Sequence, residues 1–137
     1  MTGPLRVLVV TVVHDPRDAR ILHREIPALL AAGHSVTYVA PFSSTNVPPP
    51  AGVLAIDVPR SRGRRRLTAV TRARAVIRRE APRHDVVLLH DPELLMAVAG
   101  IDGPTVVWDV HEDTVAALSL KPWLPTPLHR PTAAVMT

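Results

Sequence analysis

The stretch Pro104-Thr105-Val106-Val107-Trp108-Asp109-Val110-His111-Glu112-Asp113 decides the fold. β-Favouring residues run directly into a cluster of carboxylates around one imidazole. Such a run is typical of a parallel strand that is buried on both faces and brings polar side chains to the edge of a sheet. Because an apolar core cannot hold several ionisable groups cheaply, we expect these side chains at an edge that water or a ligand reaches.

The same transition from an apolar run to a histidine followed by an acid occurs twice earlier in the chain. His14-Asp15 follows the run from Leu5 to Val13, and His90-Asp91 follows the run from Val86 to Leu89. Because the carboxyl ends of parallel strands meet at one edge of a sheet, we expect these two pairs beside His111-Glu112.

The remaining segments alternate between strand and helix patterns. Strands are predicted over residues 5–13, 35–40, 53–58, 86–89 and 105–110, and helices over residues 19–32, 67–81, 92–99, 112–120 and 128–137. Residues 41–52 are predicted as a loop, and Pro27 predicts a kink or a restart in the first helix. The alternation predicts an α/β fold with a Rossmann-like, doubly wound parallel sheet and helices on both faces. By length, residues 1–137 form a single domain.

Composition narrows the class of protein. The chain has 137 residues, of which 47% are hydrophobic and 20% charged, as in ordinary globular domains. The absence of cysteine excludes disulfides and thiolate metal sites. The longest apolar run, Val7 to Val13, is far shorter than the ~18 residues of a membrane span, and no cleavage site follows it. We therefore expect a cytoplasmic domain.

The net charge of +4 is unevenly distributed, because residues 60–83 hold ten arginines and one acid. A basic amphipathic helix is predicted there, and such a helix can lie against an anionic membrane surface. Its cationic residues are Arg72, Arg74, Arg78 and Arg79, and its apolar residues are Val70, Ala73, Val76 and Ile77. An arginine-rich face that only contacts water is the alternative. No aromatic residue lies between Phe42 and Val107, so we expect no nucleic-acid partner.

Each histidine–acid pair also has a purely structural interpretation. Asp91-Pro92-Glu93 fits a helix N-cap, and Asp15-Pro16 fits a turn. His111 is a stronger candidate for chemistry, because it lies among carboxylates and can accept a proton or donate a hydrogen bond. The chain has no HExxH or comparable ligand spacing, so we expect no metal site.

Arg20 lies near the start of the first predicted helix. It could reach a phosphate or carboxylate at the sheet edge, or it could pair with Asp18 or Glu25 on the helix surface. The turn before this helix has no glycine, so neither GxGxxG nor a P-loop is present.

Three segments together resemble one known family. Residues 6–25, followed by Gly33-His34-Ser35-Val36-Thr37, look like the opening of glycosyltransferase family 4 enzymes, and residues 90–95 and 108–113 resemble later strand ends of that family. The similarity is to bacterial members that build surface polysaccharides and related glycoconjugates. It implies a GT-B fold, in which two Rossmann-like domains face each other and a sugar is transferred from a nucleotide donor with retention.

The resemblance also implies roles for individual residues. His111 matches the family's histidine beside the transferred sugar and is the expected catalytic residue. Arg20 and Glu25 match the Arg and Glu of the first helix, and His14 stands where a loop approaches the donor diphosphate. The glycine common in that loop is missing. The expected substrate-binding residues are His14, Arg20, Glu25, His90, Asp91, Asp109 and Glu112.

On this interpretation, the chain is the acceptor-side domain and is inactive alone. The nucleotide-sugar domain would come from elsewhere, and no cofactor or metal is expected. Partners would be a nucleotide-sugar donor, a glycan, lipid-linked or small-molecule acceptor, the inner face of the membrane, or a second copy. Alternatives are a non-catalytic module that binds a membrane, a glycan or a partner subunit, and a flavodoxin-like domain. The latter is disfavoured because it would need a lysine near the last strand and paired acids after the first.

Overall fold

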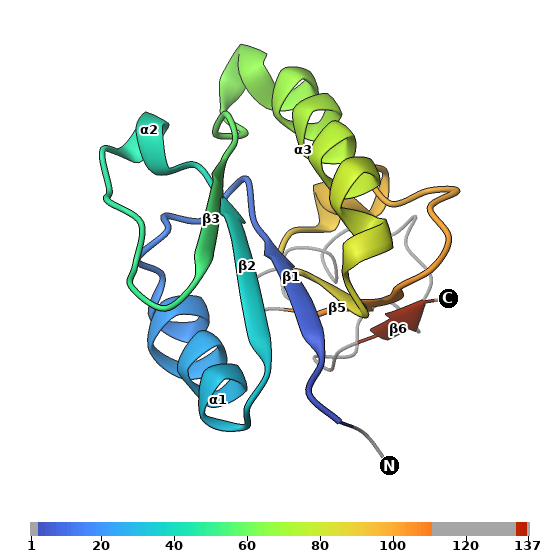
Figure 1. Ribbon diagram of the computed structural model, residues 1–137. Helices are drawn as coiled ribbons and strands as arrows, with labels where there is room; N and C mark the ends of the chain where they lie inside the picture. Colours follow the sequence, from blue (N-terminus) through green and yellow to red (C-terminus); the bar gives the residue numbers. More distant parts are fainter. Residues whose placement is uncertain (1–2, 111–133, 137) are drawn as a thin grey trace.

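A computed structural model describes residues 3–110 and 134–136. The strands within these residues form one sheet in the order β3-β2-β1-β4-β5-β6. Their bounds are β1 Arg6–Val10, β2 Ser35–Ala40, β3 Leu54–Asp57, β4 Val86–Leu89, β5 Thr105–Trp108 and β6 Ala134–Met136. The strands β1 to β5 are parallel and β6 is antiparallel to β5 (Figure 1). The predicted Rossmann-like α/β arrangement with a parallel sheet is therefore confirmed.

Helical segments connect these strands. They are η1 Ala19–Glu25, α1 Ile26–Ala31, α2 Phe42–Thr45, η2 Gly63–Arg65, α3 Arg66–Glu80, η3 Ala81–Arg83 and η4 Pro92–Leu95. The helices α1 and α3 lie on opposite sides of the sheet (Figure 1). This arrangement places each parallel connection on one face or the other, as in doubly wound folds.

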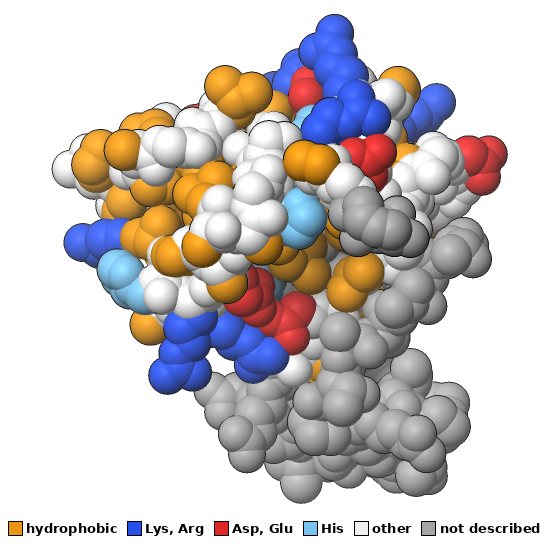
Figure 2. All heavy atoms as spheres, turned by 60° about the horizontal axis from the view of Figure 1, so that its bottom comes forward, with side chains coloured by type: hydrophobic (Ala, Val, Ile, Leu, Met, Phe, Trp, Pro, Cys, Tyr) orange, Lys and Arg blue, Asp and Glu red, His pale blue; other side chains and the backbone are white. Residues whose placement is uncertain are grey.

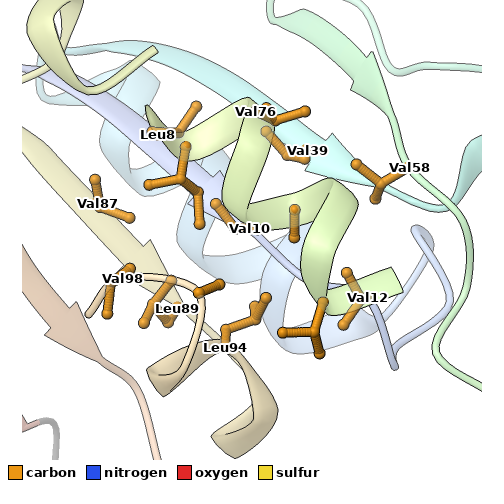
Figure 3. Packing of buried hydrophobic residues seen from close by; sticks show 14 of the residues in the cluster. Leu8, Val10, Val12, Val39, Val58, Val76, Val87, Leu89, Leu94 and Val98 are labelled. Atoms are coloured by element: carbon orange, nitrogen blue, oxygen red, sulfur yellow. The ribbon is translucent and has the colours of Figure 1, made fainter. Parts of the chain in front are cut away.

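Alternate side chains of β1 point to opposite faces of the sheet, so the core has two layers. Leu8 and Val10 point toward α3 and are fully buried (Figure 3). Val7 and Val9 belong to the second layer, on the side of α1, where Ile26 is buried. Because both faces of the strand are covered, its residues are continuously apolar rather than alternating.

The first helix is not one continuous α-helix, as the position of Pro27 predicts. Residues Ala19–Glu25 form a π-helix, in which the N–H of Ile26 donates to the carbonyl of Ile21. The α-helix begins only at Ile26, so Pro27 falls in its first turn, where its missing N–H needs no partner. The predicted restart is thus present.

Three predicted boundaries need correction. The helix expected over residues 128–137 is wrong at Ala134–Met136, which pair with β5 as a strand. A short apolar run cannot distinguish helix from strand by its periodicity, and the open edge of β5 selects the strand. Of residues 92–99, only Pro92–Leu95 are helical, as the 3₁₀ segment η4. The loop 41–52 contains α2, because Phe42 is buried with its ring edge-on to Tyr38. The helix predicted over 112–120 lies outside the described residues.

Charged side chains are unevenly spread over the surface. On the face turned forward in Figure 2, basic side chains gather in groups near the margins, and hydrophobic side chains are exposed between them. No helix among residues 3–110 and 134–136 is both long enough and apolar enough to cross a membrane.

Candidate functional site

Three parallel strands end side by side at the carboxyl edge of the sheet. Their ladder continues one residue beyond the strands through the N–H groups of Thr11, His90 and Asp109. These donate to the carbonyls of Val39 (2.9 Å), Val10 (3.1 Å) and Leu89 (2.9 Å), respectively. All three donors are buried. The edge at which the sequence places polar side chains is therefore formed by β1, β4 and β5.

Asp91 is the centre of the first polar cluster, which we call the His14 cluster (Thr11, His14, Asp18 and Asp91). Its carboxylate accepts hydrogen bonds from the N–H of Val12 (2.6 Å), the N–H of Val13 (3.1 Å) and the hydroxyl of Thr11 (3.0 Å). Although Asp91 occupies the N-cap position of η4, its side chain makes no capping bond there. The N-cap interpretation is therefore wrong for the carboxylate, which instead ties the end of β4 to the loop after β1.

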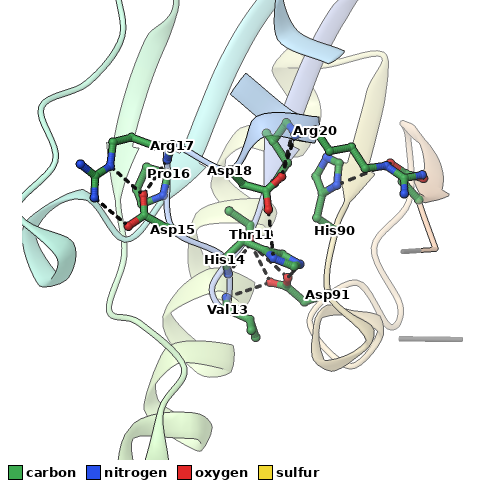
Figure 4. Close-up of polar contacts among 12 residues, drawn as sticks. Thr11, Val13, His14, Asp15, Pro16, Arg17, Asp18, Arg20, His90 and Asp91 are labelled. Atoms are coloured by element: carbon green, nitrogen blue, oxygen red, sulfur yellow. Dashed lines mark hydrogen bonds and ion pairs between the residues drawn. The ribbon is translucent and has the colours of Figure 1, made fainter. Parts of the chain in front are cut away.

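His14 lies between two carboxylates of this cluster (Figure 4). Its Nε2 is 3.3 Å from Asp91 Oδ1, and its Nδ1 is 3.6 Å from Asp18 Oδ2. The His14 N–H donates to Thr11 Oγ1 (3.1 Å), which holds the loop in place. The side chain remains 25% exposed. An oriented imidazole therefore faces solvent at the sheet edge.

The two other acids of this loop have structural roles. Asp15 Oδ1 accepts the N–H of Arg17 (2.8 Å) and the carboxylate pairs with the Arg17 guanidinium. The Arg17 guanidinium holds the pKa of Asp15 below its usual value. The turn interpretation of Asp15-Pro16 is therefore supported. Asp18 caps η1, since its Oδ1 accepts the N–H groups of Arg20 and Ile21.

A second cluster lies deeper, and we call it the His90 cluster (Arg20, Glu25, His90 and Asp109). The His90 side chain is fully buried, with Nε2 2.8 Å from Glu25 Oε2 and Nδ1 3.7 Å from Asp109 Oδ2. Arg20 bonds Asp109 through Nη2 to Oδ1 (2.6 Å) and Nε to Oδ2 (3.1 Å). The cluster thus joins η1 to the ends of β4 and β5.

Arg20 pairs across the sheet edge with Asp109 and, at a longer distance, along its own helix with Glu25. The sequence allowed a pair with Asp18 or Glu25, and only the second occurs, at 3.6 Å from Arg20 Nε to Glu25 Oε1. Its two-pronged bonds go to Asp109, which is 89 residues away in sequence. Arg20 is therefore already engaged by carboxylates of the chain.

Burial dominates the electrostatics of the His90 cluster. It lowers the pKa of His90 to about 4, although Asp109 and Asp91 act in the opposite direction. Burial also raises the pKa of Asp109, as does Glu25, and Arg20 opposes this rise. For Asp91, burial raises the pKa against the hydrogen bonds that its carboxylate accepts. His90 is therefore neutral at pH 7.

Glu25, His90 and Asp109 bring ligand atoms within 4.8 Å of one another, close enough to contact one cation. Both oxygens of Asp109 are bonded to Arg20, however. An ion would have to displace the guanidinium and place a second positive charge beside it. The donor set thus fits an internal ion-pair network better than a metal centre.

Several predicted site residues lie elsewhere. The expected catalytic residue His111, and Glu112 after it, are outside the described residues.

The predicted amphipathic helix α3 buries its apolar residues Val70, Ala73, Val76 and Ile77 in the core. That side is therefore closed to a membrane, which corrects the expectation. Arg74 Nη1 donates to the carbonyl of Ala99 (2.7 Å), and Arg79 pairs with Glu80, whereas Arg72 and Arg78 are exposed.

Thr11 belongs to the His14 cluster, and the sequence pattern does not single it out. It lies within the apolar run before His14 and is fully buried, and its hydroxyl accepts the backbone N–H of His14 and donates to the carboxylate of Asp91. The sequence signal that could have identified Thr11 is a hydroxyl residue at the point where an apolar strand ends.

A scan against protein-family models, a search of curated proteins and a search of solved structures each found no match to this chain.

Proposed function

We propose that this chain is the acceptor-side domain of a retaining glycosyltransferase of the GT-B type. It would act on a nucleotide-sugar donor and a glycan, lipid-linked or small-molecule acceptor. The observation that carries this proposal is the partly exposed imidazole of His14, which lies between Asp18 and Asp91 at the carboxyl edge of a parallel sheet. Ligands of open α/β sheets bind at such edges.

The geometry of His14 suits a sugar hydroxyl. The 3.6 Å between Nδ1 and Asp18 Oδ2 is longer than a good hydrogen bond. A hydroxyl, which both donates and accepts, can bond the imidazole and the carboxylate together. Because Thr11 and Asp91 fix the loop before binding, little ordering entropy is lost when a saccharide binds.

The His90 cluster supports the site from behind. Arg20, Glu25, His90 and Asp109 bond to one another, so we assign them a positioning role in place of the substrate contacts expected from the sequence. Asp109 stands two residues before His111, and its bonds to Arg20 hold the end of β5. We propose that His111 contacts the transferred sugar.

Saccharide binding tests the domain directly. We expect saturation-transfer NMR with a panel of nucleotide sugars and simple glycosides to show contacts that His14→Gln removes. His23→Gln is the matched control, because His23 is exposed on η1 and belongs to neither cluster. A chain that binds none of these saccharides, or loses binding equally in both variants, contradicts the proposed role of His14.

Transfer needs a second, nucleotide-binding domain. We expect sugar transfer when such a domain from a family 4 glycosyltransferase is added as a separate polypeptide, and loss of transfer with His111→Ala. Saccharide binding with no transfer from any donor would favour the alternative of a non-catalytic binding module.

A further inference from the structure

A pocket that is lined by cationic side chains lies beside the sheet edge. Ser44, Arg60, Arg62, Arg64 and Arg65 surround a pocket of about 380 Å³. It shares no residue with the His14 or His90 cluster. Its volume falls within the range of about 300–1,000 Å³ that is usual for small-molecule sites. We call it the arginine pocket.

The loop that forms the arginine pocket is held in place before any ligand arrives. The N–H of Arg60 donates to Ser44 Oγ (3.3 Å), and Arg60 Nε donates to the carbonyl of Val13 (3.2 Å). Ser61 is buried, donates its N–H to the carbonyl of Val12 (2.8 Å) and bonds Glu93 through its hydroxyl. These bonds anchor the centre of the loop, so the guanidinium groups are presented from a fixed backbone.

The positive charge of the pocket is not neutralised by an acid in the part of the chain that the structure describes. Among residues 3–110, no ion pair joins an acid to any of the four arginines. Asp15 is near enough to Arg60 for its pKa to be lowered by it, but its carboxylate is bonded to Arg17. Guanidinium groups gathered without a counter-ion repel one another, and an anion relieves that repulsion.

The start of α3 adds to the same imbalance. Its N-cap, Arg65, makes no side-chain capping bond, and the first turn holds no acid. A helix N-terminus carries partial positive charge, so arginines are unfavourable there and an anion is favourable. Arg78 and Arg79 in the last turn are favourable for the helix itself. Helix stability therefore explains the arginines at the end of α3 and not those at its start.

We propose that the arginine pocket binds a ligand bearing a diphosphate or closely spaced phosphate groups. Guanidinium groups bond phosphate oxygens in pairs, and several of them match the multiple charges of such a ligand. Ser44 supplies a neutral donor at the rim. The phosphates can belong to a soluble molecule or to a lipid head group. A separate groove of about 290 Å³ is lined by Arg66, Leu67, Val70, Glu93 and Met96, and the Leu67 and Met96 side chains in it are exposed.

Calorimetry with inorganic pyrophosphate tests the soluble form. We expect saturable binding to the whole chain that weakens between about 50 mM and about 200 mM salt. The double variant Arg62→Gln/Arg65→Gln should lower the affinity at least about tenfold, since charged hydrogen bonds are lost. The control double variant Arg72→Gln/Arg78→Gln removes the same amount of charge from the outer face of α3. Its affinity for pyrophosphate should stay within about twofold of that of the wild type.

Vesicle sedimentation tests the lipid form. Phosphatidylcholine vesicles containing phosphatidic acid should retain the chain, and pyrophosphate should release it, if the head group is the physiological source. Binding of pyrophosphate without retention on vesicles assigns the pocket to a soluble ligand and also supports it. If neither pyrophosphate nor the vesicles bind saturably, the proposal is overturned. Equal losses in both double variants overturn it too, because they would show a response to net charge alone.

Discussion

His14 and His90 each follow a parallel strand and precede an aspartate, yet their surroundings differ. The side chain of His14 is 25% exposed between Asp18 and Asp91, whereas that of His90 is fully buried against Glu25 and Asp109. The difference arises from distance along the chain. His90 is the first residue beyond β4 and still bonds in the ladder, but His14 is three residues beyond Thr11, the last ladder residue of β1. The same two-residue pattern therefore gives a partly exposed histidine at one strand end and a buried histidine network at the other.

The largest expected effect on stability comes from Asp91, whose carboxylate organises the His14 cluster. Asp91→Ala removes the acceptor for the N–H groups of Val12 and Val13 and for the Thr11 hydroxyl, and the bonds to Val12 and Thr11 are buried. We expect a loss of about 3–5 kcal/mol in the free energy of unfolding, measured with urea at neutral pH. The matched variant Asp85→Ala breaks an exposed pair with Arg6 and should cost far less. Equal losses would show that Asp91 does not organise the loop.

The buried histidine should make stability depend on pH. Its pKa is about 4 in the folded chain and about 6.5 when unfolded, so the unfolded state binds more protons between these values. The contribution of His90 to stability is therefore complete above about pH 6.5 and falls by about 3 kcal/mol as the pH drops to about 4. Urea titrations across this range measure it.

His90→Gln should remove that pH dependence, whereas His14→Gln should keep it. Several charged groups interact with the His90 imidazole, namely Glu25, Asp109, Asp91, His14 and Arg20. The raised pKa values of Asp91 and Asp109 act oppositely, because they add stability as the pH falls. The difference between wild type and His90→Gln isolates the histidine, and an unchanged profile would contradict its burial as a neutral group.

Removal of Arg20 should have a smaller effect on the deep cluster. Arg20→Ala leaves Asp109 and Glu25 close together without the guanidinium, at a cost of about 1–2 kcal/mol, since Arg20 is partly exposed. The loss should shrink at low pH, where the raised pKa of Asp109 makes it neutral early. Arg20→Lys should recover only part of it, because lysine cannot form the two-pronged bond. Full recovery by lysine would mean that only charge matters.

The smallest effect on stability is expected at the exposed histidine. His14→Gln removes a partly exposed side chain and should change the free energy of unfolding by less than about 1 kcal/mol. The same variant should abolish saccharide contacts in NMR, as proposed above. A large loss of stability would place His14 with His90 among the structural histidines and remove the contrast between them.

Much of the fold follows from local pattern, and the exceptions follow from long-range contacts. Continuous apolar runs predict β1, β2, β4 and β5, because a strand covered on both faces needs no polar alternation. The restart at Pro27 is predicted from its missing N–H. The strand at Ala134–Met136 is not, since only the open edge of β5 distinguishes it from a helix.

The candidate site divides in the same way. The sequence by itself determined that histidines and acids follow the strands, because apolar runs end where polar groups must leave the core. Tertiary structure alone decided that Asp91 binds the loop after β1, that Arg20 pairs with Asp109, and that His90 is buried while His14 faces solvent. These outcomes depend on contacts between residues about 80 to 90 positions apart. Burial and pairing at that separation are properties of the assembled sheet edge, which no local pattern records.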